Sequence, residues 1–311
     1  MKKMRLNPTK SRESHVLNKK VREWLIFIFK VVLSLVAIIY VLKRVNLGDI
    51  ANVIGSASYI YLAFAFLLFI ASKIVAAWRT LLILHQYGIS ISGWDNLKLY
   101  WTGMFYNLFL PGGIGGDVYK TVIINNMHDN GIRISAGSVI TDRIAGVAAL
   151  MILALLCIPF TGLISDFWWV TMAGVPVVLL GFAGIILIFM PDLKSITGGL
   201  LLRSFMVQGL QMLAILLILL AFNIKTDQIE YLMIFLISSV AAMLPISVGG
   251  IGIREMVFFK ISDLLFLDQK VAVAISLTFY LITLFASSFG IITALEKRQH
   301  NKSEKTAIIK T

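Results

Sequence analysis

Six apolar segments, each close to twenty residues long, constrain this chain more than any other feature. They cover residues 24–42, 58–78, 134–158, 167–190, 200–222 and 271–294. A helix needs about 20 apolar residues to cross the ~30 Å hydrocarbon core of a bilayer. Only 14% of the residues are charged, whereas soluble domains carry about 25%. The sequence therefore predicts an all-α polytopic membrane protein and excludes a soluble globular domain.

Two further apolar segments are too short to cross a bilayer, and each runs into a proline followed by glycines. Residues 97–110 lead into LPGGIGGD, and residues 230–243 lead into LPISVGGIG. If both segments crossed, several Lys and Arg residues would fall outside, against the positive-inside rule. We therefore predict about six crossing helices plus two re-entrant Pro/Gly-broken hairpins. The first hairpin would enter from the cytoplasm, the second from outside, and both termini would be cytoplasmic, with eight full crossings as the alternative.

The string GGIG occurs at residues 112–115 and again at 249–252, each time soon after Leu-Pro. Hairpins that enter from opposite sides would make this an inverted repeat. Paired Gly/Pro-interrupted segments in two halves of a membrane protein indicate the central site of a transporter. Chance repetition in a glycine-rich chain is the alternative.

Charge divides the chain into three predicted parts: a basic segment at 1–23, a transmembrane domain at 24–294 and a basic tail at 295–311. The formal net charge is +12. In membrane proteins basic residues gather in cytoplasmic segments, where they attract anionic lipid headgroups. No basic stripe carries interleaved aromatic residues, so we expect no nucleic-acid partner.

The two glycine turns are the first candidate site. Proline ends a helix, and glycines then allow backbone conformations that other residues avoid. Clustered N–H groups at the start of a following helix attract anions, and a phosphate would fit there. The alternative is that the glycines only permit close helix packing. The residues concerned are Gly112, Gly113, Gly115 and Gly116 in the first turn, and Gly249, Gly250 and Gly252 in the second.

Asp142 and Arg143 lie about eight residues inside a predicted crossing helix, where charge is costly and usually faces a cavity or a partner. Adjacent helical residues point about 100° apart, so we expect at least one of them to pair elsewhere. A structural Asp–Arg pair is the alternative.

Further charged residues lie beside the predicted turns and helix ends. Arg79 is expected at the inner end of the second helix, and Lys73 is expected to snorkel to the interface as a structural residue. The candidates that follow the two turns are Asp117 and Lys120 after the first, and Arg254 and Glu255 after the second.

Two predicted helices carry a stripe of polar residues along one face. We expect these stripes to contact neighbouring helices, and the alternative is that they line a cavity. Their residues are Ser204, Gln208 and Gln211, and Ser276, Tyr280, Thr283 and Ser287.

Enzyme signatures are scarce. The four histidines are scattered, and the sequence has neither a metal-ligand spacing nor a nucleophile elbow. We expect no enzymatic activity, no metal and no cofactor.

Three motifs together resemble the lysylphosphatidylglycerol synthase transmembrane, or flippase-like, family. They are NLFLPGGIGGDVYK at 107–120, TDRIAG at 141–146 and LPISVGGIGIREMVF at 244–258. The resemblance runs from about residue 24 to 294. It implies a multi-pass protein of the bacterial inner membrane that moves an anionic or aminoacylated lipid between leaflets. The positions matching the family's hallmarks are Gly112, Gly113, Gly115, Gly116, Asp117, Asp142, Arg143, Gly249, Gly250, Gly252, Arg254 and Glu255.

The family that the motifs resemble includes the membrane half of the bacterial multiple-peptide-resistance factor, which carries a soluble aminoacyl-transfer domain after that half. Here a basic tail at 295–311 follows instead. We therefore expect no lysyltransferase chemistry from this chain.

We expect a lipid translocase in which Arg143 and Arg254 neutralise a headgroup from the inner and outer sides, and Arg79 recruits it at the cytoplasmic face. The alternative is a membrane-embedded lipid-modifying enzyme, or an accessory subunit of a lipid pathway, with Asp117 or Glu255 as acid or base. A small-solute transporter is a third alternative. Partners left open are a second copy of the chain and a lipid-synthesis protein.

Overall fold

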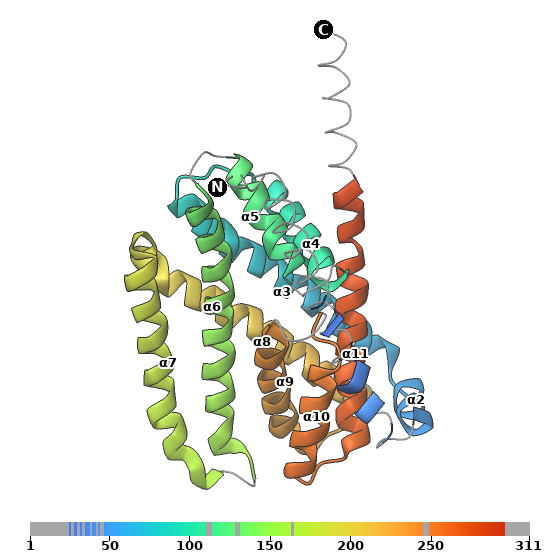
Figure 1. Ribbon diagram of the computed structural model, residues 1–311. Coiled ribbons are helices and arrows are strands. Elements are labelled where there is room, and N and C mark those ends of the chain that lie inside the picture. The colour runs from blue at the N-terminus through green and yellow to red at the C-terminus, as the bar shows by residue number, and fades with distance from the viewer. Residues whose placement is uncertain are drawn as a thin grey trace, which may run out of the picture.

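The computed structural model describes residues 47–109, 114–127, 131–162, 165–244 and 249–295, and single positions between 25 and 43. Every regular element in these ranges is a helix (Figure 1). The segments predicted at 1–23 and 296–311, most of the span predicted at 24–42, and the candidates Gly112 and Gly113 lie outside the described residues.

Within the described ranges, five helices are long and apolar enough to cross a membrane, and they confirm five of the six predicted spans. α3 (Tyr59–Gln86), α6 (Ile132–Cys157) and α7 (Trp168–Phe189) are the first three. α8 (Thr197–Ala221) and α11 (Gln269–Ser288) complete the set. The protein is therefore a multi-pass helical membrane protein.

Four shorter helices form two pairs, each interrupted where the sequence has its glycine turn. α4 (Gly93–Phe109) and α5 (Gly115–Met127) have 17 and 13 residues. α9 (Gln228–Met243) and α10 (Ile253–Leu264) have 16 and 12. At 1.5 Å per residue these helices are about 18–26 Å long, which is less than the ~30 Å of a bilayer core. Figure 1 shows the α4–α5 pair near one end of the molecule and the α9–α10 pair near the other.

The remaining elements connect the long helices. α2 (Leu47–Gly55) precedes α3 and lies in a part of the chain where no apolar span was predicted. Three 3₁₀ segments, Ile158–Phe160, Ser165–Phe167 and Pro191–Ile196, form the turns on either side of α7.

The largest core cluster lies where α3, α8, α9, α10 and α11 meet. Phe69, Phe235 and Phe258 are among its fully buried side chains, and the ring of Phe279 packs edge-on against Phe69 and Phe235. In contrast to the helices of this core, α7 is mostly exposed. It is apolar on all sides but buries only Thr171, Phe182 and Ile186. A helix of that kind has its exposed faces in lipid. The long helices therefore pack around the short pairs and present their outer apolar faces to the lipid.

Candidate functional site

The end of α4, just before the first glycine turn, touches the second glycine turn. Gly249 has φ +61°, and a Cβ atom there would lie 2.8 Å from Cδ1 of Leu108, near the end of α4. A larger residue at this position would therefore be strained and would push the α4 end away. The contact places the end of α4, the first helix of the first short pair, directly against Gly249 of the second turn.

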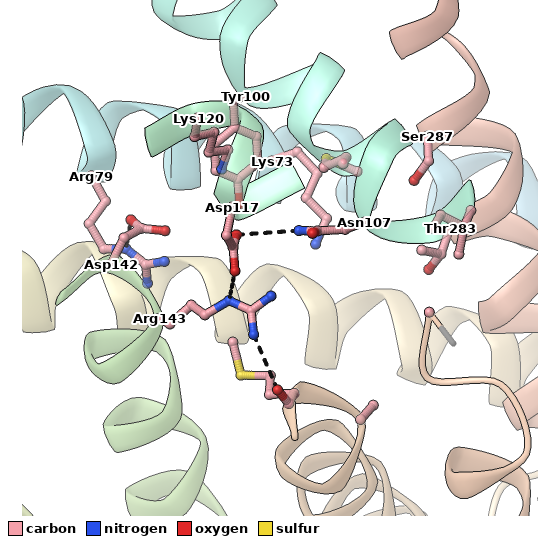
Figure 2. Close-up of a pocket in the computed structure, with 15 residues that line it drawn as sticks. Lys73, Arg79, Tyr100, Asn107, Asp117, Lys120, Asp142, Arg143, Thr283 and Ser287 are labelled. Atoms are coloured by element: carbon pink, nitrogen blue, oxygen red, sulfur yellow. Dashed lines mark hydrogen bonds and ion pairs between the residues drawn. The ribbon is translucent and has the colours of Figure 1, made fainter. Parts of the chain in front are cut away.

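A polar cavity of about 240 Å³ opens beside this contact (Figure 2). Its wall combines α3, α4, α5, α6, the end of α9, Gly249 and α11. Six charged side chains line it: Lys73, Arg79, Asp117, Lys120, Asp142 and Arg143. Four cations against two carboxylates leave the wall with an excess of two positive charges.

The first ion pair in the wall joins Arg79 of α3 to Asp142 of α6. Arg79 Nε donates to Asp142 Oδ1 at 2.8 Å, and Nη1 donates to Ser204 Oγ of α8, also at 2.8 Å. Thr80 Oγ1 donates to the same carboxylate oxygen at 3.2 Å. Because the guanidinium and the carboxylate each have further hydrogen bonds, this buried pair is well satisfied and ties three crossing helices together.

The second ion pair joins Arg143 of α6 to Asp117 of α5, and Arg143 also bonds α9, so it connects the two pairs of short helices. Arg143 Nε contacts the carboxylate of Asp117, in the first turn of α5, and Nη1 donates to the carbonyl of Met243, at the end of α9, at 3.3 Å. Asn107 of α4 supports Asp117, since its Oδ1 accepts from Gly116 N at 2.8 Å and its Nδ2 donates to Asp117 Oδ1 at 3.4 Å. A carboxylate at a helix start and a cation at a helix end both suit the helix dipole.

Lys73 and Lys120 are the other two cations. The Lys120 ammonium lies 3.8 Å from the Tyr100 ring centroid, and that of Lys73 lies 4.3 Å from the Phe69 ring centroid. Lys120 is 7% exposed. Within the described ranges, neither ammonium has a carboxylate within ion-pair distance or a hydrogen-bond acceptor. Figure 2 shows both beside Tyr100, adjacent to the two ion pairs.

The sequence model of a family described as "Lysylphosphatidylglycerol synthase TM region" matches residues 27–197, which is more than half of the chain. The chain belongs to this family. The match confirms the resemblance that the motifs indicated. No curated protein matches the chain.

The family match includes the first short pair and both ion-paired residues of α6, and it ends before the second glycine turn. The structure connects the two regions, because Arg143 inside the matched region contacts Met243 beyond it. Among the predicted site residues, Arg79, Asp117, Lys120, Asp142, Arg143 and Gly249 line the cavity.

The candidates that follow the second turn do not line the cavity. The Arg254 guanidinium lies 4.9 Å from the ring centroid of Phe279 and 5.8 Å from that of Phe235. Glu255 is 4% exposed and accepts from Gly252 N at 2.7 Å and from Ser276 Oγ at 3.0 Å. Its carboxylate therefore caps α10 and fixes it to α11.

The remaining glycines serve packing and turn geometry. Gly116 packs so tightly on α4 that a Cβ there would overlap the carbonyl of Gly103, and Gly115 begins α5. Gly250 and Gly252 have φ of +82° and +83°, and Gly250 faces Ala242. Positive φ at these positions lets the chain reverse between α9 and α10.

The expectation for Arg79 needs correction. The sequence placed it at the inner end of its helix, where it would recruit a headgroup. The structure continues α3 to Gln86, about 10 Å beyond Arg79. Arg79 is 4% exposed and paired with Asp142, so it lies inside the protein.

Several cavity residues were not among the predicted candidates. Lys73 was expected at the interface but lines the cavity, as do Tyr100, Asn107, Thr283 and Ser287. Thr283 and Ser287 belong to the polar stripe of α11, and Asn107 opens the first family motif, so both patterns contained a signal. In the part of the chain that the structure describes, no group of three His, Cys, Asp or Glu residues could hold a metal ion.

Proposed function

We propose that this protein flips an anionic or aminoacylated phospholipid, or a related lipid-linked amphiphile, between the leaflets of the bacterial inner membrane. The observation that carries the proposal is the cavity, which combines an excess of two positive charges with a position where the end of α4 meets the second glycine turn. A headgroup enters this cavity while its acyl chains stay in the bilayer. Membership in the family fits a role in lipid metabolism or translocation.

Both short pairs are re-entrant hairpins in this proposal, and they form an inverted repeat. Their helices are too short to cross, and the pairs lie toward opposite ends of the molecule (Figure 1). The contact between Leu108 and Gly249 supports a meeting point inside the membrane. Movement of one half against the other would then open the cavity to each leaflet in turn.

The orientation proposed has both termini in the cytoplasm. α11 leads into a tail that contains Lys297, Arg298, Lys302, Lys305 and Lys310. The connection between α6 and α7, at the opposite end of the bundle, has no Lys or Arg. The positive-inside rule assigns the end of α11 to the cytoplasm.

The enzyme alternative would use Asp117 or Glu255 as its acid or base. Asp117 is held by Arg143 and Asn107, and Glu255 caps α10 away from the cavity. These contacts favour transport over catalysis. Lipid extracts from a deletion strain separate the two by mass spectrometry: an unchanged set of lipid species fits a flippase, whereas a missing lipid species fits an enzyme.

The direct test is a flipping assay with the purified protein in liposomes. The liposomes contain phosphatidylglycerol or phosphatidic acid that carries a fluorescent label on an acyl chain. We expect redistribution between leaflets above that of protein-free liposomes. Lys120→Met should lower the rate about tenfold or more, because it removes a cavity charge. Arg203→Met is the matched control, since Arg203 lies outside the cavity lining and, among the described residues, donates to the Gly199 carbonyl of its own helix alone. If wild-type liposomes behave like empty ones, the protein is not a flippase for these lipids.

A further inference from the structure

The charges of the cavity differ in whether they are already neutralised. Arg79 is paired with Asp142, and Arg143 is paired with Asp117 and also bonds the Met243 carbonyl. An incoming headgroup would have to break these contacts to use either arginine. Both carboxylates are equally committed, so neither is available to bind a cation.

The two ammonium groups are different. Lys120 is more than nine-tenths buried, and among the described residues its ammonium contacts the face of the Tyr100 ring and has no hydrogen-bond acceptor, so its three donors remain available in the cavity wall. Lys73 likewise rests on Phe69. A buried ammonium without an acceptor is costly, and an anion that satisfies its donors removes that cost. The site is thus built for a ligand with about two negative charges.

Among lipid headgroups, this requirement separates phosphate monoesters from diesters. A terminal phosphate carries about −1.5 to −2 at pH 7 and offers three acceptor oxygens. A phosphodiester carries a single charge. Thr283 and Ser287 add hydroxyl groups to the wall across from the lysines, and a terminal phosphate has enough acceptors for both kinds of donor.

Size acts in the same direction. The cavity volume of about 240 Å³ lies below the ~300–1,000 Å³ of pockets for drug-sized ligands. An aminoacyl group would add both bulk and an ammonium. That ammonium would face Lys73 and Lys120 without a free carboxylate, and like charges brought face to face are strongly unfavourable.

We propose that the cavity selects lipids whose headgroup ends in a phosphate monoester, with Lys73 and Lys120 as the phosphate ligands, and that it rejects aminoacylated lipids. This inference rests on the proposed function only in taking the ligand to be a lipid. It narrows the substrate class to the phosphorylated and non-aminoacylated members.

The test measures binding without transport. The full-length protein in nanodiscs is offered phosphatidic acid, phosphatidylglycerol and lysyl-phosphatidylglycerol with identical acyl chains, and bound lipid is counted by native mass spectrometry. We expect phosphatidic acid to bind about tenfold more tightly than phosphatidylglycerol at pH 7.5, and lysyl-phosphatidylglycerol to bind weakest. The preference over phosphatidylglycerol should shrink at pH 5, below the second phosphate pKa of about 6.

Lys120→Met and Lys73→Met should each abolish most of that preference, and Arg203→Met should retain it. Two separate lysine variants keep the test decisive if one fails to fold, which thermal melting will show. Equal binding of all three lipids, or tighter binding of the lysyl lipid, would overturn the inference. Saturation by soluble glycerol 3-phosphate at the same concentration as phosphatidic acid would also overturn it, since the ligand would then be a soluble ester.

Transport and selectivity can fail separately. If phosphatidic acid is preferred but no lipid moves in the liposome assay, flipping is refuted and the selectivity stands. If labelled lysyl-phosphatidylglycerol, added as a third lipid to the liposome assay, moves as fast as phosphatidic acid, the selectivity is refuted and flipping stands.

Discussion

At the residue scale, Arg143 joins the two halves of the site. Its guanidinium contacts the first turn of α5 through Asp117 and the last turn of α9 through the Met243 carbonyl. The neighbouring Asp142 faces another direction and pairs with Arg79. This confirms the expectation that at least one of the two adjacent charges pairs elsewhere. Neighbouring side chains on a helix diverge by about 100°.

Removing one partner of the buried Arg79–Asp142 pair should destabilise the protein, whereas the pair as a whole adds no net charge to the cavity. Asp142→Leu leaves an unpaired guanidinium in the interior and should cost about 3–5 kcal/mol of unfolding free energy. The double variant Arg79→Met/Asp142→Leu removes one charge of each sign, so it should recover most of that loss. Thermal melts in one detergent would measure both. A double variant as unstable as the single one would show that the pair is not an isolated unit.

The sequence could identify the charged residues of the site but not their pairing. Asp117, Lys120, Asp142 and Arg143 were all candidates, because charge at membrane depth is rare enough to be informative. Lys73 was misplaced, since a lysine near a helix centre can reach either the interface or a cavity. Only the arrangement of neighbouring helices decides between the two.

At the element scale, the glycines of the first short pair act through close packing. The α5 helix approaches α4 so closely at Gly116 that a single added carbon meets the Gly103 backbone. The Gly116 N–H also bonds Asn107, which in turn supports Asp117. The close contact between α4 and α5 at Gly116 therefore positions Asp117 in the cavity wall.

Gly116→Ala should accordingly lower the melting temperature and weaken lipid binding, because α5 must move away from α4. Gly209→Ala is the matched control, since its position within α8 has open space around it and alanine is favoured over glycine in a helix by up to about 1 kcal/mol. We expect the control to be neutral or slightly more stable. Equal melting temperatures for the two variants would contradict the packing account.

The length of the apolar segments predicted the five long helices well, because a helix that crosses a bilayer needs about 20 apolar residues. The prediction was weaker at helix ends: α3 runs to Gln86, although its apolar segment stops at residue 78. Residues beyond that point stay helical because they pack on other protein segments, with Ile83 and Leu84 fully buried. α2 was missed, since a short helix of nine residues needs no long apolar run.

At the scale of the whole molecule, the inverted arrangement of the two hairpins stays a prediction that labelling can test. The chain has one cysteine, the buried Cys157, so a Cys157→Ala background is suitable for single-cysteine scanning. Cysteines at the exposed positions Ser90 and Ser195 should react with an impermeant reagent from the cytoplasmic side only. Those at Asp166 and Thr226, also exposed, should react from the opposite side only. Labelling of positions 90 and 195 from different sides would rule out this topology.

The most direct measurement of the central claim is a cryo-electron microscopy structure of the protein in nanodiscs that contain phosphatidic acid. The account predicts headgroup density inside the cavity, in contact with Lys73 and Lys120 and beside the Leu108–Gly249 contact, with acyl chains extending into the bilayer. A cavity without headgroup density, with lipid ordered only on the outer faces of the long helices, would contradict it.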